Sequence, residues 1–152
     1  MNRKIKNAEK YKYGDITFRS KLEKDAYILL SEEEDFMVEY EKVTYVLMEG
    51  FRPNTPFYRS TKSTPFRNDA KKVIEITYTP DFTVCYKNVF AIIEIKGFPN
   101  DVYPVKRKLF RRLLDVAVSK EDDTVDYMFF EIKTMRELRK AIQIIKDGEK
   151  IS

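Results

Sequence analysis

The chain has 152 residues, of which 43% are hydrophobic and 36% are charged, and its formal net charge at pH 7 is +4. This length and composition are typical of one globular domain with its own buried core, which we expect over 15–148 behind a basic lead over 1–14. Cys85 is the only cysteine and histidine is absent, so an intramolecular disulfide, a Cys/His zinc site and a histidine general base are excluded.

The sequence carries no sign of a membrane or export segment. No stretch approaches the roughly eighteen apolar residues that a membrane span needs, and the first twelve residues lack an apolar signal region. We therefore expect a soluble cytoplasmic protein, in the host cytoplasm if a phage encodes it. The basic residues gather over 1–12, 59–72 and 106–112, a distribution that either a polyanionic partner or a set of solvated faces would explain.

The first predicted elements are a helix, a strand and a long connection. Ser20 to Glu34 has apolar residues at helical spacing, and Ser20 with Glu23 matches an S-x-x-E capping box. Residues 36–47 alternate apolar positions with a slip in phase, which predicts a strand with a bulge. Residues 50–71 are rich in proline and basic side chains, so they predict a long exposed loop or a loose hairpin extension.

The rest of the chain predicts two strands, a helix, a strand and a helix, over 72–86, 89–96, 101–118, 125–132 and 134–146. The first of these strands bends near Pro80, a turn at Lys87 and Asn88 joins it to the second in an antiparallel hairpin, and Asp101 is placed to cap the helix. The order of elements predicts an α/β fold, in which helices cover both faces of a mixed sheet.

Charged residues suited to metal-dependent chemistry lie on the predicted hairpin. Asp81 precedes Glu94 by thirteen residues, so strand pairing brings the two carboxylates together. Because side chains alternate along a strand, Glu94 and Lys96 project from the same face. Carboxylates suit Mg²⁺, and an ammonium group beside the ion either stabilises charge that develops on a phosphoryl group or lowers the pKa of the attacking water.

These residues resemble the signature of the PD-(D/E)XK nuclease superfamily, which here reads Pro80-Asp81 and Glu94-Ile95-Lys96. Within it, the stretches 18–23 and 78–82 are similar to small phage endonucleases, including enzymes that resolve Holliday junctions. The resemblance spans roughly Phe18 to Leu114. It implies a restriction-endonuclease-like fold with an α-β-β-β-α-β core plus a C-terminal helix, and an endonuclease that acts on DNA with Mg²⁺, for which Mn²⁺ would substitute.

The resemblance also assigns roles to particular residues. Glu23, Asp81, Glu94 and Lys96 would be catalytic, and Asp81, Glu94, the Ile95 carbonyl and Glu23 would bind the metal; the capping box is the competing role of Glu23. Basic residues on the second helix and in the long loop are candidates for contacts with DNA phosphates, against the competing interpretation of solvated faces. They are Lys106, Lys108, Arg111, Arg112, Arg59, Lys62 and Arg67.

Other interpretations remain open on the sequence alone. The triplets Asp69-Ala70-Lys71 and Glu131-Ile132-Lys133 also fit the acidic-x-Lys pattern, and the second would require an acidic cluster made of Asp122, Asp123 and Asp126. The chain could instead be a catalytically inactive nuclease-fold protein that binds nucleic acid, or a structural or partner-binding phage protein. Junction-resolving enzymes act as dimers because they cut two strands, so the resemblance also raises a homodimer. Neither DNA against RNA nor branched against linear substrates is decided.

Overall fold

The computed structural model describes residues 11–96, 101–120 and 124–148; the basic lead as far as residue 10, the strand-breaking residues 97–100, and Asp122 and Asp123 lie outside them. Its centre is a four-stranded sheet in the order β10-β9-β8-β3. The strands are β3 (Met37–Tyr40), β8 (Phe82–Tyr86), β9 (Val89–Ile95) and β10 (Asp126–Ile132). β3, β8 and β9 pair antiparallel, whereas β10 is parallel to β9. The predicted mixed sheet and its β8–β9 hairpin are confirmed.

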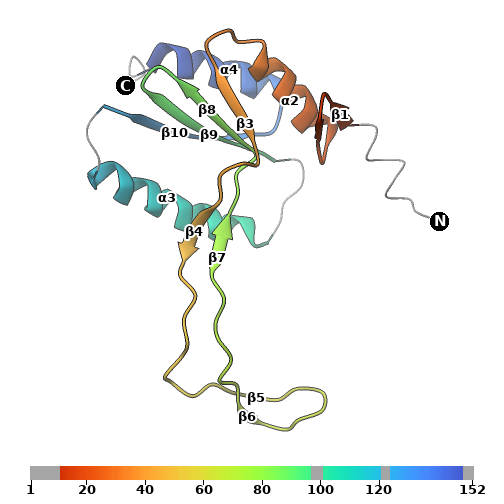
Figure 1. The fold of residues 1–152 in the computed structure, drawn as a ribbon, viewed down its shortest axis with the longest axis vertical. Helices are drawn as coiled ribbons and strands as arrows, with labels where there is room; N and C mark the ends of the chain where they lie inside the picture. The colour runs from red at the N-terminus through yellow and green to blue at the C-terminus, as the bar shows by residue number, and fades with distance from the viewer. Residues whose placement is uncertain (1–10, 97–100, 121–123, 149–152) are drawn as a thin grey trace, which may run out of the picture.

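Helices cover both faces of this sheet, as Figure 1 shows: α2 (Lys21–Ser31) and α4 (Met135–Asp147) on one face and α3 (Tyr103–Lys120) on the other. The helices can pack on both faces because successive side chains of β9 point to opposite faces of the sheet. Ala91 and Ile93 join the core beneath α2 and α4, while Ile92 packs with Phe110 of α3. The predicted α/β fold is confirmed. Within the described residues, every helix is too short or too polar to cross a membrane.

Helix α2 begins as the sequence predicts, with Ser20 as its N-cap. The Ser20 hydroxyl accepts a hydrogen bond from the Glu23 backbone N–H at 3.1 Å, which satisfies one of the unpaired donors of the first turn. The Glu23 carboxylate accepts instead from the Tyr40 hydroxyl at 2.6 Å. The N-cap therefore involves only the backbone N–H of Glu23, and the Glu23 carboxylate contacts Tyr40 at the end of the sheet instead.

The start of α3 differs from the prediction. The helix begins at Tyr103, and the Lys106 N–H donates to the Val102 carbonyl at 3.2 Å. Val102 thus occupies the position before the first helical residue, and the predicted cap by Asp101 is wrong. A polar residue close to a helix start is not enough to define its first turn, because tertiary packing, here that of buried Tyr103, also sets where the helix begins.

The strand predicted over 36–47 is two strands in two different sheets. β3 ends at Tyr40, Glu41 adopts a positive φ of 48°, and the chain then enters β4 (Tyr45–Met48). β4 pairs with β7 (Ile76–Tyr78), which is separated from β8 at Pro80. The single bulged strand is therefore wrong, and the slip in phase marks a change of sheet.

β4 and β7 continue into a long two-stranded extension, residues 51–74, here called the arm. Phe51 and Val73 exchange backbone hydrogen bonds of 2.9 and 2.8 Å, and β5 (Tyr58–Arg59) pairs with β6 (Arg67–Asn68) farther out. Gly50 suits the close approach of the two strands at its base, because a Cβ there would lie 3.0 Å from the Val73 carbonyl oxygen. The predicted hairpin extension is confirmed, and it projects away from the body of the protein (Figure 1).

A short hairpin that the sequence analysis did not predict precedes α2. β1 (Lys12–Tyr13) pairs with β2 (Ile16–Thr17) around a turn in which Gly14 has a φ of 59°. The Phe18 N–H donates to the Tyr11 carbonyl at 3.0 Å, and Phe18 is buried in the core. The hairpin thereby delivers the chain to the N-cap of α2.

The arm contributes none of its side chains to the two buried clusters, so we expect the body to fold without it. Replacing 52–72 by Asn-Gly closes the hydrogen-bonded pair of Phe51 and Val73 with a two-residue turn. The deletion removes the contacts made within the arm, but the shorter loop costs less entropy to close. We therefore expect the free energy of unfolding to fall by no more than about 1 kcal/mol. Urea denaturation followed by circular dichroism measures this, and a much larger loss would show that the arm supports the core.

Candidate active site

Four acidic residues lie in one row across the end of the sheet. Glu94 of β9 is paired in register with Glu131 of β10. On the other side of β9, Ile93 pairs with Phe82 of β8 and Phe82 pairs with Tyr40 of β3, and these are the last paired positions between the three strands at this end. The next position outward places Glu41 beside Asp81 and Asp81 beside Glu94, and the Glu41 N–H donates to the Asp81 carbonyl at 2.8 Å. The row is therefore Glu41, Asp81, Glu94 and Glu131.

Three members of the row have a basic partner. Arg19 lies 2.9 Å from Glu41, Lys96 3.6 Å from Glu94, and Arg107 2.8 Å from Glu131. Within the described part of the chain, no Lys or Arg lies within 4.0 Å of the Asp81 carboxylate, whose Oδ2 accepts from the Ile95 N–H at 2.7 Å. Asp81 is only 7% exposed. A buried carboxylate without a cation is costly, so this position is where an additional positive charge would be most stabilising.

Glu23 of α2 also lies close to Asp81 at this end of the sheet. Oxygen atoms of Glu23, Glu41 and Asp81 all lie within 4.8 Å of one another. Oxygen ligands of one octahedral Mg²⁺ lie about 2.9 to 4.1 Å apart, so small movements of these side chains would let all three contact one ion. Glu23 is 8% exposed, so two of the three carboxylates are buried. The hard, anionic donor set fits a small divalent cation.

The pKa of the Asp81 carboxyl also fits a position that favours a bound cation. Burial raises the pKa of the Asp81 carboxyl from its ordinary 3.8 to about 8, and the charge of Glu94 adds to the effect. The Ile95 N–H acts in the opposite direction, and the charges of Glu23 and Glu41 raise the pKa further. Without a cation the carboxyl therefore retains its proton at neutral pH, and a bound cation would displace that proton.

The Glu94 carboxylate contacts Tyr78 and Lys96 and is not part of the group formed by Glu23, Glu41 and Asp81. The Tyr78 hydroxyl donates to its Oε2 at 2.6 Å, and Lys96 lies 3.6 Å from its Oε1. Burial raises the pKa of Glu94, although Tyr78 and Lys96 oppose the change. Burial and the charge of Glu94 raise the pKa of the Tyr78 hydroxyl as well, so it remains a donor. Glu94 and Lys96 thus project from one face, as the alternation of the strand predicts.

The first turn of α3 helps to position the Lys96 side chain. Its ammonium lies 3.4 Å from the centroid of the Tyr103 ring, and its side chain is 17% exposed. A cation over an aromatic face is stabilised by the ring quadrupole. Between Glu94 and Tyr103, the ammonium is confined beside the row of carboxylates while part of it still reaches solvent.

The predicted site residues therefore divide as follows. The structure brings Glu23 and Asp81 together and places Glu94 and Lys96 next to them, while Glu41 is a member that the sequence analysis missed. Glu41 carries no motif, and Tyr40 with Glu41 reads as the middle of a strand. The register of β3 against β8 reveals it, because that pairing places the residue after Tyr40 beside Asp81.

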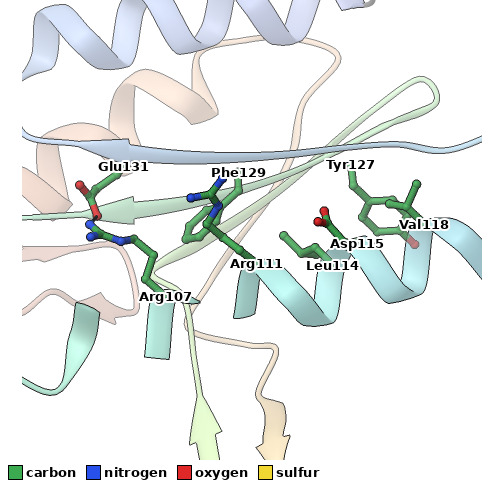
Figure 2. A pocket seen from close by; sticks show the side chains of 8 residues that line it. All are labelled: Arg107, Arg111, Leu114, Asp115, Val118, Tyr127, Phe129 and Glu131. Carbon is green, nitrogen blue, oxygen red and sulfur yellow. Dashed lines mark hydrogen bonds and ion pairs between the residues drawn. The ribbon is translucent and has the colours of Figure 1, made fainter. Parts of the chain in front are cut away.

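The predicted phosphate-binding residues lie outside this cluster. On α3, Lys108, Arg111 and Arg112 are exposed and Lys106 is partly exposed, and in the arm Arg59, Lys62 and Arg67 are exposed. Arg111 lines a groove of about 500 Å³ between α3 and β10, with Arg107 and Glu131, the last member of the row, at one end (Figure 2). Leu114 and Phe129 add apolar side chains to its lining. The groove adjoins the site but none of Glu23, Glu41, Asp81 or Glu94 lines it.

The alternative triplets do not build a comparable cluster in the described residues. Asp126 and Glu131 stand five positions apart on β10, which corresponds to about 16 Å along a strand. Glu131 is paired with Arg107, and the Asn88 side chain donates to Asp126 at 3.0 Å. Asp69 lies in the arm, 3.7 Å from Arg59. The acidic cluster with buried members is that of Glu23, Glu41 and Asp81.

The fold and the site together define an α/β protein with a partly buried carboxylate cluster and a confined lysine at one end of its sheet. The family model described as "Protein of unknown function (DUF1064)" matches residues 3–120, and the chain belongs to this family. No curated protein and no solved structure matches it.

The pH dependence of stability tests the burial of Asp81. Between pH 4 and pH 8 the folded metal-free protein keeps a proton on Asp81 that the unfolded chain has lost, so its free energy of unfolding falls as the pH rises through this window. We expect Asp81→Asn, which cannot ionise, to lose much of that dependence. Thermal melting in EDTA at pH 5 to 8.5 measures the difference, and parallel profiles for the two proteins would contradict it.

Metal titration tests the group of three carboxylates. We expect Mn²⁺ to raise the melting temperature, more at pH 8 than at pH 6 because the ion competes with the Asp81 proton. Glu41→Gln should weaken Mn²⁺ binding at least about ten-fold, since even residues behind the ligands change affinity by that factor. The matched control is Glu39→Gln, two residues earlier on β3 and paired with Lys42 at 3.2 Å. Equal affinities of both variants and the parent would remove Glu41 from the site.

Proposed function

We propose that this protein is a metal-dependent endonuclease that hydrolyses phosphodiester bonds in DNA, with Glu23, Glu41 and Asp81 holding the ion. The observation that carries the proposal is the buried Asp81 carboxyl, which lies among three other acidic groups, accepts from the Ile95 N–H and has no Lys or Arg within 4.0 Å among the described residues. Ionising this carboxyl calls for a cation, and the nearby ammonium of Lys96 completes a site suited to phosphate chemistry.

Each residue of the site has a role in this proposal. A Mg²⁺ ion bound by the carboxylates would neutralise phosphoryl oxygens and activate a water molecule. The confined Lys96 ammonium stabilises negative charge that develops on the phosphoryl group. In the metal-free protein Glu94 orients Lys96, and Tyr78 in turn holds Glu94 through a 2.6 Å hydrogen bond. Lys96 would lose much of its positional restraint without Glu94 and Tyr103.

The resemblance to the PD-(D/E)XK nucleases supports the same conclusion from a separate direction. In that pattern, Glu94 is a metal ligand together with Asp81, and the Ile95 carbonyl is a third. Here Asp81 and Glu94 are adjacent in the row, so a rotation of the Glu94 side chain away from Tyr78 would bring it to an ion at Asp81. We propose that Glu94 exchanges Tyr78 for the ion when the metal binds.

Cleavage assays test the proposal. Four-way junction, linear duplex, single-stranded DNA and RNA are incubated with the protein in Mg²⁺ and, separately, in EDTA. We expect DNA cleavage in Mg²⁺ alone and a loss of about 100-fold or more in Lys96→Ala, the size of effect seen when one group that stabilises transition-state charge is removed. The set of substrates identifies the DNA structure that is cut.

Lys133→Ala is the matched control, because Lys133 occupies the position next to Lys96 on the neighbouring strand and is exposed. We expect it to cut within about three-fold of the parent, as for surface changes in general. Nucleic-acid binding without cleavage would favour the inactive nuclease-fold protein. Absence of nucleic-acid binding together with no effect of Mn²⁺ on melting would favour the structural or partner-binding protein.

A further inference from the structure

The positive charge of this protein is concentrated in the arm. Residues 51–74 contain six basic residues and one acidic residue, a net charge of +5, whereas the whole chain carries +4. The other 128 residues together are therefore at −1. The basic residues of the arm are Arg52, Arg59, Lys62, Arg67, Lys71 and Lys72. All of them are exposed, which leaves the arm able to attract a polyanion while the body is close to neutral.

The basic residues at the tip of the arm surround a cavity. Arg59 and Arg67 are direct cross-strand partners in the β5–β6 pair. Like charges in opposite positions destabilise a hairpin, and only Arg59 has a recorded acidic neighbour, Asp69, at 3.7 Å. Arg59, Arg67 and Lys71 line a cavity of about 260 Å³. An anion seated there would relieve the repulsion between the two arginines.

Exposed aromatic side chains accompany these charges. Tyr58 and Phe66 are 55% and 72% exposed, and their rings stack on each other with centroids 5.8 Å apart. Phe57 beside them is 58% exposed. Aromatic faces interleaved with basic groups suit the sugars and bases of a nucleic acid in addition to its phosphates. A small anion such as free phosphate would use the charges but not the rings.

The arm is joined to the row of carboxylates by β4 and β7. The chain enters β4 a few residues after Glu41, and after β7 it rejoins the main sheet through Asp81 at the start of β8. The Thr44 and Thr79 hydroxyls, 2.7 Å apart, link the two strands where they leave the body. The arm extends from that point away from the sheet (Figure 1). A nucleic acid held along the arm would therefore lead to the candidate active site.

We propose that the arm is a nucleic-acid-binding element that grips the phosphate backbone of the substrate away from the bond that is cut, chiefly through Arg59, Lys62 and Arg67. The inference rests on the proposed function in taking DNA as the substrate. Binding can be measured without cleavage, so the two proposals can fail separately.

The experiment measures binding of a fluorescent 40-base-pair DNA duplex by anisotropy in EDTA, over a series of salt concentrations. We expect Arg59→Ala/Lys62→Ala/Arg67→Ala to weaken binding about ten-fold or more at 100 mM salt, and to lower the slope of log K against log salt by about 2 to 3, because each lost phosphate contact removes about 0.9. The protein with 52–72 replaced by Asn-Gly should show at least the same loss.

The matched control is Arg136→Ala/Arg139→Ala/Lys140→Ala, which removes the same charge from exposed positions of α4 on the opposite face of the sheet from α3. We expect it to change the affinity less than about three-fold and to leave most of the salt slope intact. Equal losses in the two triple variants would overturn the proposal, since net charge alone would then explain binding.

Two further outcomes complete the test. Unchanged DNA affinity in the arm variants, with a parent dimer that becomes monomeric by light scattering, would overturn the proposal and make the arm a contact between copies of this chain. A parent that cuts no DNA but loses binding through the arm variants would overturn the proposed endonuclease and leave the arm proposal standing. The same titration with an RNA duplex identifies which nucleic acid the arm prefers.

Discussion

The repulsion among acidic side chains at one end of the sheet is the constraint on which the site depends. Strand register alone places Glu41, Asp81, Glu94 and Glu131 side by side. Arginine or lysine offsets the charge at every position except Asp81, as far as the described residues show. The Asp81 carboxyl is buried and accepts a hydrogen bond from the backbone N–H of Ile95. Ionising such a buried group without a partner costs stability, and a bound cation would remove that cost.

The same end of the sheet is where the chain leaves the body to build the arm. The pairing of the main sheet ends before Glu41, which has a positive φ, and at Asp81, and the chain segments beyond them pair with each other as β4 and β7. The change of sheet thus places an acidic residue before β4 and another after β7, the two strands that carry the arm. Tyr78 of β7 also reaches back to Glu94. A single departure from regular pairing therefore connects β4 and β7, and through them the arm, with the carboxylates.

Sequence patterns predicted most of the fold because they depend on local physics. Alternation and apolar content identified β8, β9, β10 and the helices, and Ser20 identified the start of α2. The strand over 36–47 was predicted as one element because a change of sheet and a bulge produce the same slip in phase. The β1–β2 hairpin escaped prediction because its strands have two residues each, too few for any alternation to be seen.

The sequence by itself determined which residue types are present and how they alternate, and therefore that Asp81, Glu94 and Lys96 fall on one hairpin with Glu94 and Lys96 on one face. Tertiary structure decided the rest. It brought in Glu41 through the register of β3 and Glu23 through the packing of α2, and it placed the Tyr103 ring beneath Lys96. Glu23 and Glu41 come from segments distant in sequence from Asp81, and only the pairing of strands and the packing of helices sets the distances between these groups.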